Sequence, residues 1–441
     1  MNKNDIIAVA ASDYNEQAFA VCKHEGFVVF VKDMMISEVA EVRLEKVSER
    51  HAYGRINKMI EQSSQRVTPR CPLASKCGGC QIQHMSTDAQ LDFKKKHVIS
   101  LFKRNLNLDI DPIIHGMEDP WFYRNKTQVP FDVTKRTIDY GFYRSHTHDI
   151  LPFTTCYIQS DESNSILLDI KRFYDASAIK PNALRTVLIK KAFSTGELMV
   201  VFVSRKDSLP NQKQLIEELS RNHPQIKSFV INVNTREDNV ILGDTYIPLT
   251  KQTVITDTLG GLKFEISAAS FFQVNPTQAA VLYESALSLA KVSSKDTVLD
   301  LYCGIGTIAL LAASKAKAVI GVEIVEAAIE DAKRNASLNG ITNVEWICSD
   351  AGKAAETLIE NKTKIDVLVV DPPRKGLDET TRQAILAINA PKVVYVSCDP
   401  GTLVRDLKIL SDKYTIEQVE LTDMFPQTVH VETVVLITRV K

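Results

Sequence analysis

From about residue 261 to the end of the chain, short apolar runs alternate regularly with helical patterns. Such alternation is typical of βαβ units, and therefore of a parallel sheet with helices on its faces. This pattern constrains the fold more than any other feature, because ligands of open parallel sheets bind outside the carboxyl ends of the strands. We therefore expect the residues that directly follow each apolar run to form one site.

Two successive apolar runs end at reactive groups. Residues 364–370 lead to Asp371, and residues 392–396 lead to Cys398. A carboxylate and a thiol at neighbouring strand ends would face one pocket. The pattern predicts an active site in which Cys398 is the nucleophile.

A glycine-containing loop follows the first predicted strand of this region, residues 296–302. Gly304 and Gly306 allow a tight turn and a close approach of the backbone to a ligand. The loop lacks the third glycine of the dinucleotide-binding fingerprint, which argues against NAD. A Rossmann-like sheet that binds another ligand remains the alternative.

Acidic residues close four successive predicted strands, a pattern that resembles the S-adenosylmethionine-dependent methyltransferase fold. Glu323 is placed to accept hydrogen bonds from a ribose, and Asp350 follows the third strand, where an adenine would lie. Asp371 with its two prolines is also compatible with amino methyltransferases, but these need no cysteine nucleophile. Cys398 therefore favours carbon methylation. The four acids are Asp300, Glu323, Asp350 and Asp371.

Carbon methylation explains a second catalytic group. C5 of uracil is too weak a nucleophile to attack a methyl sulfonium, and thiolate addition at C6 makes it reactive. A base must then remove the C5 proton before the thiolate can leave. Glu432, near the start of the final predicted strand, is the candidate base, and a solvated acid at a strand start is the alternative. Cys303 and Cys348 are expected to be buried in the sheet, and Cys22 in the N-terminal region.

The composition is that of a globular protein without membrane segments. At 441 residues two or three domains are expected, and hydrophobic content of 44% with charged content of 24% is ordinary for such proteins. No run of eighteen apolar residues occurs, and the N-terminus does not begin a signal peptide. We expect a cytoplasmic protein with no membrane partner. The net charge of −1 leaves nucleic-acid binding open, because local patches decide it.

The region before residue 261 has two parts. Residues 1–57 contain short predicted strands at 6–10, 17–21, 27–31 and 38–44, which suggest a small β-barrel, either nucleic-acid-binding or a structural appendage. Residues 58–260 mix strands and helices. Helices are predicted at 85–105 and 211–221, and strands at 198–203 and 228–233.

Basic residues cluster between positions 94 and 144. Each cluster, taken alone, fits a solvated face. The second one interleaves cations with Trp121, Phe122 and Tyr123, which suits stacking of bases and binding of phosphates. The clusters are Lys94 to Lys96 with Lys103 and Arg104, then Arg124 with Lys126, and then Arg136 and Arg144.

Three cysteines, Cys71, Cys77 and Cys80, lie within one short segment. In a reducing compartment disulfides are not expected, so three close thiols favour a metal site. Cys156 is the nearby spare cysteine for a fourth ligand. The sequence allows a four-cysteine zinc site or an iron–sulfur cluster.

The chain resembles the RNA uracil-5-methyltransferase family over essentially its whole length. Residues 1–57 are similar to its N-terminal TRAM domain, an RNA-binding barrel, although residues 12–18 lack the usual glycine-rich turn. Barrel and cysteines together resemble the 23S rRNA branch, because the tRNA branch is expected to lack both. The matching segments are 71–80, 272–275, 300–304, 371–376, 396–400 and 430–432.

The resemblance implies three domains: a TRAM/OB-like β-barrel (1–57), an α+β domain with the cysteines (58–260), and a Rossmann-like α/β methyltransferase domain (261–441). Part of 93–120 is expected to pack with the last. It also implies that Cys398 is the nucleophile and Glu432 the base. The implied ligand sets are Gln273, Tyr302, Gly304, Glu323, Asp350 and Asp371 for S-adenosylmethionine, and Cys71, Cys77, Cys80 and Cys156 for a [4Fe-4S] cluster.

The implied substrate is RNA, with 23S rRNA preferred and Arg124, Lys126 and Arg144 as expected contacts. We expect a monomer. The alternatives are a tRNA uracil-5-methyltransferase and a catalytically silent rRNA-binding or assembly factor. The presence of both Cys398 and Glu432 argues against a silent factor.

Overall fold

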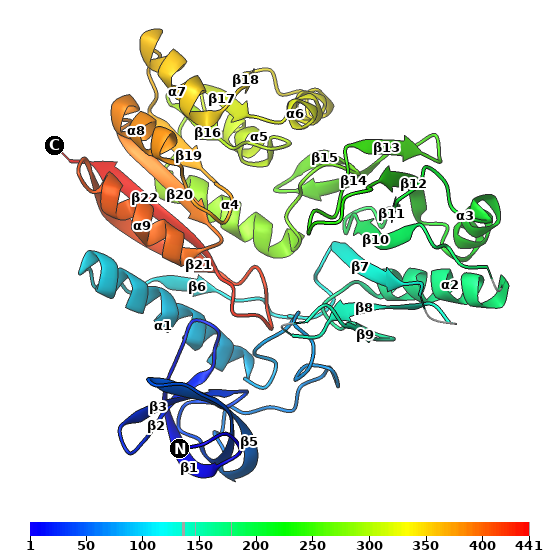
Figure 1. Cartoon of the computed structure of the whole chain (residues 1–441). Helices are drawn as coiled ribbons and strands as arrows, with labels where there is room; N and C mark the ends of the chain where they lie inside the picture. Colours follow the sequence, from blue (N-terminus) through cyan, green and yellow to red (C-terminus); the bar gives the residue numbers. More distant parts are fainter. Residues whose placement is uncertain (135–136, 146, 178, 441) are drawn as a thin grey trace. The chain divides into compact units, whose positions relative to one another are not determined.

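The computed structural model describes residues 1–134, 137–145, 147–177 and 179–440 (Figure 1). The chain divides into two compact units. The first unit contains 1–100, 143–149 and 425–430, and the second contains 101–142, 150–424 and 431–441. Arg136, one of the expected basic residues, lies outside the described residues.

The first unit contains the expected N-terminal barrel, which is closed in the order β1-β2-β3-β5-β4. Small and medium apolar side chains such as Cys22, Val29 and Val42 fill its interior, since alternate residues of each strand point inward. Three of the four predicted strands are confirmed, and the strand predicted at 17–21 begins three residues later, at Ala20. A fifth strand was not predicted, because exposed polar residues such as Arg55, Asn57 and Lys58 interrupt its apolar pattern. The strands are β1 (Ile6–Tyr14), β2 (Ala20–His24), β3 (Phe27–Lys32), β4 (Val39–Val47) and β5 (His51–Glu61).

Turns without regular structure follow β5 and carry Cys71, Cys77 and Cys80. The next element is the predicted long helix, α1 (Thr87–Leu106). Lys94, from the first basic cluster, is fully buried, and its Nζ donates to the carbonyl of Phe425 at 3.1 Å. This lysine therefore belongs to the interior of the first unit and not to a phosphate-binding face.

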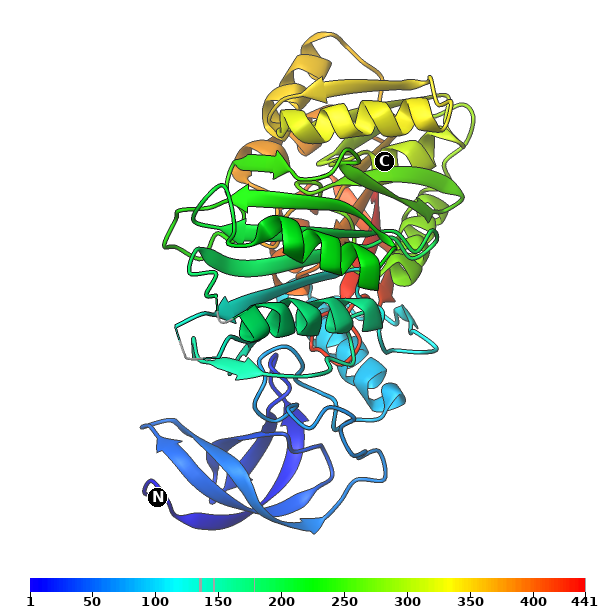
Figure 2. The ribbon, with the colours of Figure 1, turned by 90° about the vertical axis from the view of Figure 1, so that its right-hand side faces the viewer.

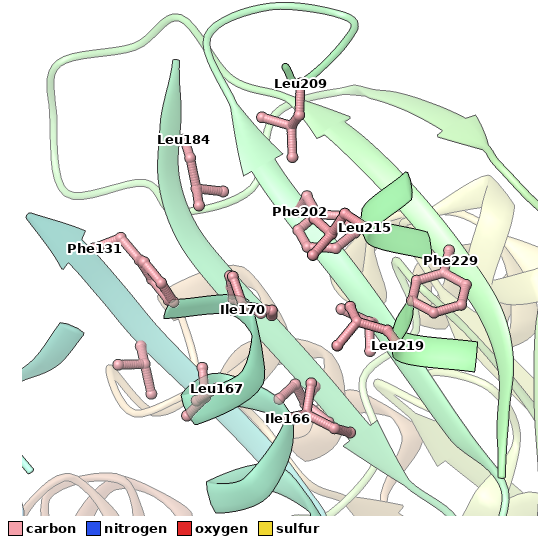
Figure 3. Close-up of a cluster of buried hydrophobic side chains, with 14 of the residues drawn as sticks. Phe131, Ile166, Leu167, Ile170, Leu184, Phe202, Leu209, Leu215, Leu219 and Phe229 are labelled. Carbon is pink, nitrogen blue, oxygen red and sulfur yellow. The ribbon is translucent and has the colours of Figure 1, made fainter. Parts of the chain in front are cut away.

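A seven-stranded sheet in the order β13-β12-β11-β10-β7-β8-β9 forms one part of the second unit. Both of its helices pack on one face (Figure 2), and Figure 3 shows apolar side chains of the helices beside those of the strands. The predicted strands at 198–203 and 228–233 and the helix at 211–221 are confirmed. The elements are α2 (Asp161–Ser177), α3 (Gln212–Asn222), β7 (Lys126–Asp132), β8 (Asp139–Tyr143), β9 (Ile150–Pro152), β10 (Leu184–Lys191), β11 (Leu198–Ser204), β12 (Ile226–Val233) and β13 (Thr245–Pro248).

An eight-stranded sheet in the order β18-β17-β16-β19-β20-β22-β21-β6 forms the other part of the second unit. Five neighbouring strands are parallel, as predicted, and β22 runs antiparallel between β20 and β21. The strands are β6 (Ile113–His115), β16 (Thr297–Leu301), β17 (Ala318–Glu323), β18 (Val344–Cys348), β19 (Val367–Val370), β20 (Lys392–Ser397), β21 (Tyr414–Thr422) and β22 (Glu432–Arg439).

Helices connect the parallel strands, and a separate hairpin precedes them. Among the described residues, no helix combines the length and apolar character needed to cross a bilayer. The helices are α4 (Pro276–Ala290), α5 (Thr307–Ala313), α6 (Glu326–Leu338), α7 (Ala351–Glu360), α8 (Glu379–Ile388) and α9 (Pro400–Leu410), and the hairpin strands are β14 (Val254–Leu259) and β15 (Leu262–Ser267).

The strand order reverses between β16 and β19. In open parallel sheets, such a switch point opens a crevice at the carboxyl ends of the strands, where ligands bind. The loop after β16 and the loop that begins at Asp371 flank this point. The topology therefore has a switch point at the sheet edge where the sequence predicted ligand binding.

Candidate active site

The loop after β16 turns sharply toward α5. Tyr302, Gly304 and Gly306 all have positive φ (73°, 55° and 86°), and a non-glycine residue there signals a constrained backbone. A Cβ on Gly306 would lie 2.7 Å from the Trp346 ring, so a larger residue would not fit. The positive φ angles agree with the predicted tight turn, and the close approach of this backbone to a ligand stays a prediction.

Glu323, at the end of β17, holds that loop in place. Its Oε2 accepts a hydrogen bond from the Gly304 N–H at 3.2 Å, and its Oε1 accepts from the Val325 N–H at 3.0 Å. Each carboxylate oxygen retains capacity for a further donor. The geometry is compatible with the predicted ribose contact.

Asp300 is fully buried in β16. Within the described parts of the chain, neither of its carboxylate oxygens has a hydrogen-bond partner, and the nearby Ala309 amide does not meet hydrogen-bond geometry. Burial, and then the charges of Asp371 and Glu323, raise the pKa of Asp300 well above its usual range. A buried carboxylate without partners is costly, so this position fits a cationic ligand group such as the ammonium of S-adenosylmethionine.

Two other predicted cofactor residues have contacts within the protein. The Tyr302 hydroxyl lies 3.2 Å from Thr381 Oγ1 on α8. Asp350 is the N-cap of α7, and its Oδ1 accepts from the backbone N–H groups of Gly352 and Lys353. This capping stabilises the helix and leaves Asp350 Oδ2 as the oxygen for a ligand contact.

Gln273 precedes α4 and is buried. The side chain of Asn125 donates to its carbonyl at 2.8 Å. The hydroxyl of Tyr283 forms hydrogen bonds with Gln273 and Thr307, and burial and then Asp371 raise the pKa of this tyrosine. Tyr283 was not identified from the sequence, where it reads as one more apolar residue of α4.

Cys398 and Glu432 are brought together by strand pairing. In the antiparallel register of β20 and β22, Ser397 is opposite Thr433. The next positions in this register are Cys398, directly after β20, and Glu432, the first residue of β22. Cys398 is half-buried and Glu432 is buried. The sequence alone could not give this register.

The charges around Cys398 favour the protonated forms of the acidic groups there. Burial, and then Glu432 and Asp371, raise the pKa of the Cys398 thiol to about 12, while Arg374 lowers it. Burial and Asp371 raise the pKa of Glu432 to about 8, again opposed by Arg374. Burial raises the pKa of Asp371 to about 7. A positively charged ligand would relieve this concentration of acids, which suits a methyl sulfonium.

The cysteine segment lies in the first unit beside residues 143–149. Cys77 forms an isolated bridge with Arg144, and the Gly79 N–H donates to the Cys77 sulfur at 3.3 Å. Burial raises the pKa of Cys77, and the neighbouring Cys71 raises it further, so these two thiols are close. Three thiols in one loop with an N–H···S bond fit a thiolate-bound group. Across the described residues, however, no three potential ligands are assembled as a metal site.

Cys156, the expected fourth ligand, lies in the second unit just before α2. Asn164 fixes its backbone: the Asn164 Oδ1 accepts from the Cys156 N–H at 2.9 Å, and the Asn164 amide donates to the Cys156 carbonyl at 3.2 Å. The Cys156 side chain is half-buried. Its role stays a prediction.

The expected RNA contacts are distributed over both units. Arg124 and Lys126 belong to the second unit, and burial and then the charge of Arg124 lower the pKa of Lys126. Lys126 Nζ lies 5.8 Å from the ring centre of Phe271, a side chain that is 63% exposed. Arg144 is exposed and belongs to the first unit. Phe271 was not singled out from the sequence, although it precedes the motif that contains Gln273.

One cysteine differs from its prediction. Cys348 is exposed, whereas Cys22 and Cys303 are buried as expected. The reason is its place at the end of β18, which is an edge strand of the sheet and so has a neighbour on one side only.

A parallel sheet with this strand order, and with acidic residues and glycines after the strands at its switch point, has the fold of S-adenosylmethionine-dependent methyltransferases. The model of the tRNA (uracil-5-)-methyltransferase family matches residues 87–440. The chain therefore belongs to the RNA uracil-5-methyltransferase family, as its motifs indicated.

Curated relatives extend over the full chain. An "uncharacterized RNA methyltransferase" of Bacillus cereus is 42% identical over 451 residues, covering 100% of this chain and 98% of the relative. A protein of Clostridium acetobutylicum with the same description is 42% identical over 452 residues, covering 100% of this chain and 98% of that protein. Both support RNA as the substrate class.

A solved structure is similar over the same extent. A tRNA (uracil-54, C5)-methyltransferase of Pyrococcus abyssi, in complex with S-adenosyl-L-homocysteine, gives a TM-score of 0.77 at 26% identity and covers 98% of this chain and 99% of its own. Because the match covers 98% of this chain, it includes most of the N-terminal barrel. The expectation that tRNA enzymes lack the barrel is therefore wrong for this relative, and the barrel alone does not distinguish rRNA from tRNA substrates.

Proposed function

We propose that this chain transfers a methyl group from S-adenosylmethionine to C5 of uracil in RNA, with Cys398 as nucleophile and Glu432 as base. The observation that supports the proposal is the register of β20 and β22, in which Ser397 lies opposite Thr433, so that Cys398 and Glu432 occupy the next positions of the two strands. A thiol and a carboxyl group beside an acidic cofactor crevice are the groups that carbon methylation of uracil requires.

The reaction begins when the Cys398 thiol loses its proton and the sulfur adds to C6. From a pKa of about 12, forming the thiolate at neutral pH costs about 7 kcal/mol. Bound S-adenosylmethionine would supply an electrophilic methyl group and a positive charge that reduces this cost. As the S–C6 bond forms, the C5–C6 π electrons shift toward C5, which would take the methyl group while the electrons of the broken S–CH3 bond stay on the cofactor's sulfur.

Glu432 completes the turnover. Its carboxylate removes the C5 proton, the electrons of the C5–H bond form the C5–C6 double bond, and the C6–S bond breaks to release Cys398 as thiolate. A base works best when its pKa is near the working pH, and burial places the pKa of Glu432 at about 8. The proton then leaves Glu432 to solvent.

The cofactor would contact residues at the ends of β16, β17, β18 and β19. Asp300 is the expected partner of the ammonium group, and Glu323 of the ribose. The proposed set is completed by Gln273, Tyr302, Gly304, Asp350 and Asp371.

We propose 23S rRNA as the substrate, on the combination of barrel and cysteine segment. A tRNA substrate is the second candidate, because the Pyrococcus abyssi neighbour is a tRNA enzyme. The barrel supports either RNA. The barrel carries the half-buried rings of Phe19, Phe30 and Tyr53. The ring centroid of Tyr53 lies 5.4 Å from that of Phe30 and 6.2 Å from that of Phe19. Lys46 lies opposite Tyr53 in the strand register. Rings beside cations suit stacked bases and phosphates.

Cys71, Cys77, Cys80 and Cys156 are proposed to hold a [4Fe-4S] cluster, with a four-cysteine zinc site as the alternative. The cluster would have a structural role, because the methylation itself moves electron pairs and needs no redox partner. A cytoplasmic, monomeric protein completes the proposal.

The test is methyl transfer in vitro. Purified protein, S-adenosylmethionine and transcripts of 23S rRNA or tRNA are incubated, and nucleosides are identified by mass spectrometry. We expect 5-methyluridine in 23S rRNA. The same product in tRNA alone would favour the second candidate, while no 5-methyluridine in either RNA, with RNA binding intact, would favour a silent binding factor.

A further inference from the structure

Asp406 is a fully buried carboxylate in α9, whose other buried residues are mostly apolar. Its Oδ1 accepts hydrogen bonds from the Arg405 guanidinium at 2.9 and 3.0 Å and from Arg382 Nη1 at 3.1 Å. Its Oδ2 accepts from the Leu377 backbone N–H and the Tyr395 hydroxyl, both at 2.8 Å. One side chain thus joins α8, β20, α9 and the loop after β19.

The same group of residues fixes the loop that carries Arg374. Arg405 Nη2 donates to the Lys375 carbonyl at 2.9 Å, and Arg382 Nη1 donates to the Leu377 carbonyl at 2.6 Å. On the first turn of α9, the hydroxyl of Thr402 donates to the Arg374 carbonyl at 3.2 Å. The loop backbone is therefore tied to the helix that starts immediately after Cys398.

Gly376 shows how closely this loop approaches Asp406. Its φ is +74°, and a Cβ at this position would lie 2.5 Å from Asp406 Oδ2. Only glycine satisfies both the backbone angle and the space. Asp406 therefore contacts the end of this loop directly, at Gly376 and Leu377.

Stability alone does not account for this arrangement. Burying a carboxylate with guanidinium groups carries a large desolvation cost, and apolar replacements of buried ion pairs are often neutral or stabilising. What the ion pairs provide is a defined geometry between two strand ends, one leading to Asp371 and the other to Cys398.

We propose that Asp406 is a positioning residue for the reaction: through its hydrogen bonds it fixes the loop that carries Arg374 on α9, the helix that begins just after Cys398. The inference rests on the proposed role of Cys398. Arg374 is the one cation among the principal charges acting on the thiol in the described structure; Glu432 from β22, Asp371 from the end of β19, and Asp399 at the start of α9 are the acids. Losing the arginine would leave the acids unopposed and disfavour the thiolate.

The test measures Cys398 without RNA or S-adenosylmethionine. The full-length protein is alkylated with iodoacetamide between about pH 7.5 and 9.5, where the rate follows the thiolate fraction, and the Cys398 peptide is quantified by mass spectrometry. We expect Asp406→Asn and Arg374→Gln each to slow alkylation about 3- to 10-fold at fixed pH, which corresponds to about 0.5 to 1 pKa unit. The double variant should be no slower than Arg374→Gln, since both act through one group.

Asp257→Asn is the matched control. Asp257 is equally buried and accepts backbone N–H bonds from Phe193 and Ser194, but it is absent from the principal groups acting on the thiol. It should leave Cys398 alkylation unchanged. Wild-type alkylation in Asp406→Asn, with S-adenosylmethionine binding intact, would overturn the proposal.

A second variant decides the matter if Asp406→Asn does not fold. Thr402→Ala removes only the hydroxyl that holds the Arg374 carbonyl. Slower alkylation of Cys398 in this variant supports the proposal, and an unchanged rate refutes it. Slower alkylation in a protein that makes no 5-methyluridine would leave the positioning role in place and reject the methylation proposal instead.

Discussion

Glu432→Gln should stabilise the protein while blocking its turnover. Burial raises the pKa of Glu432 from an ordinary 4.5 to about 8, so the folded state holds a proton between these pH values that the unfolded state has lost. Wild-type stability therefore falls as pH rises through this window and is constant above it. Glutamine does not titrate, so the stability of the variant does not fall over this pH range for this reason.

The magnitude follows from the shift. A change from 4.5 to about 8 corresponds to about 5 kcal/mol at 1.36 kcal/mol per unit. The stability advantage of Glu432→Gln should grow by up to about 5 kcal/mol from low pH to pH 8, with about 3 kcal/mol of it reached by pH 7. Asp371 contributes to the shift, so this is an upper limit.

The assay is urea unfolding followed by tryptophan fluorescence near pH 5, 7 and 9. Trp346 in β18 reports on the sheet that contains Glu432. The control is Glu345→Gln, at an exposed position of β18. The free energy of unfolding of this variant should differ from that of the wild type by the same amount at each pH. A Glu432→Gln advantage that does not change with pH would refute the argument that this carboxyl group is buried and destabilising when charged.

Further variants test the nucleophile, the cofactor site, the cluster and the RNA contacts. Cys398→Ala should abolish methyl transfer and leave the affinity for S-adenosylmethionine nearly unchanged, as measured by an activity assay and by calorimetry. Retained turnover would show that Cys398 is not the nucleophile. Asp300→Asn should weaken S-adenosylmethionine binding about 10- to 100-fold, since it removes a charge-assisted bond; unchanged affinity would place the ammonium elsewhere. Cys77→Ser should remove iron from anaerobically purified protein and reduce RNA affinity more than cofactor affinity; stoichiometric zinc in the wild type would contradict the cluster. Lys126→Ala should weaken RNA binding and lower its salt dependence, and an unchanged salt slope would exclude a phosphate contact.

The catalytic sheet could be predicted from sequence because its signals are local. Each parallel strand is a short apolar run, and each run ends at an acid or at Cys398, so strand ends and site coincide. The fifth barrel strand was missed because half of β5 faces solvent and carries polar residues. The exposure of Cys348 depends on the edge position of β18, which is a property of strand order and not of the residue.

Other parts of the site depend on contacts between distant segments. The pairing of Cys398 with Glu432 follows from the register of β20 and β22. Tyr283 reads as a helix-core residue until its hydroxyl is seen to bind Gln273. Asp406 reads as an ordinary charged residue of α9, and only the fold shows that it is buried. A buried acid within an otherwise apolar helical face was the available signal.

The most direct test of the account is the fate of the RNA on Glu432→Gln. The variant is incubated with substrate RNA and S-adenosylmethionine, separated on a denaturing gel, and the crosslinked band is digested for mass spectrometry. We expect a stable protein–RNA adduct in which the peptide containing Cys398 carries a uridine with one added methyl group. Methylated RNA released at the wild-type rate, or an adduct on a different residue, would contradict it.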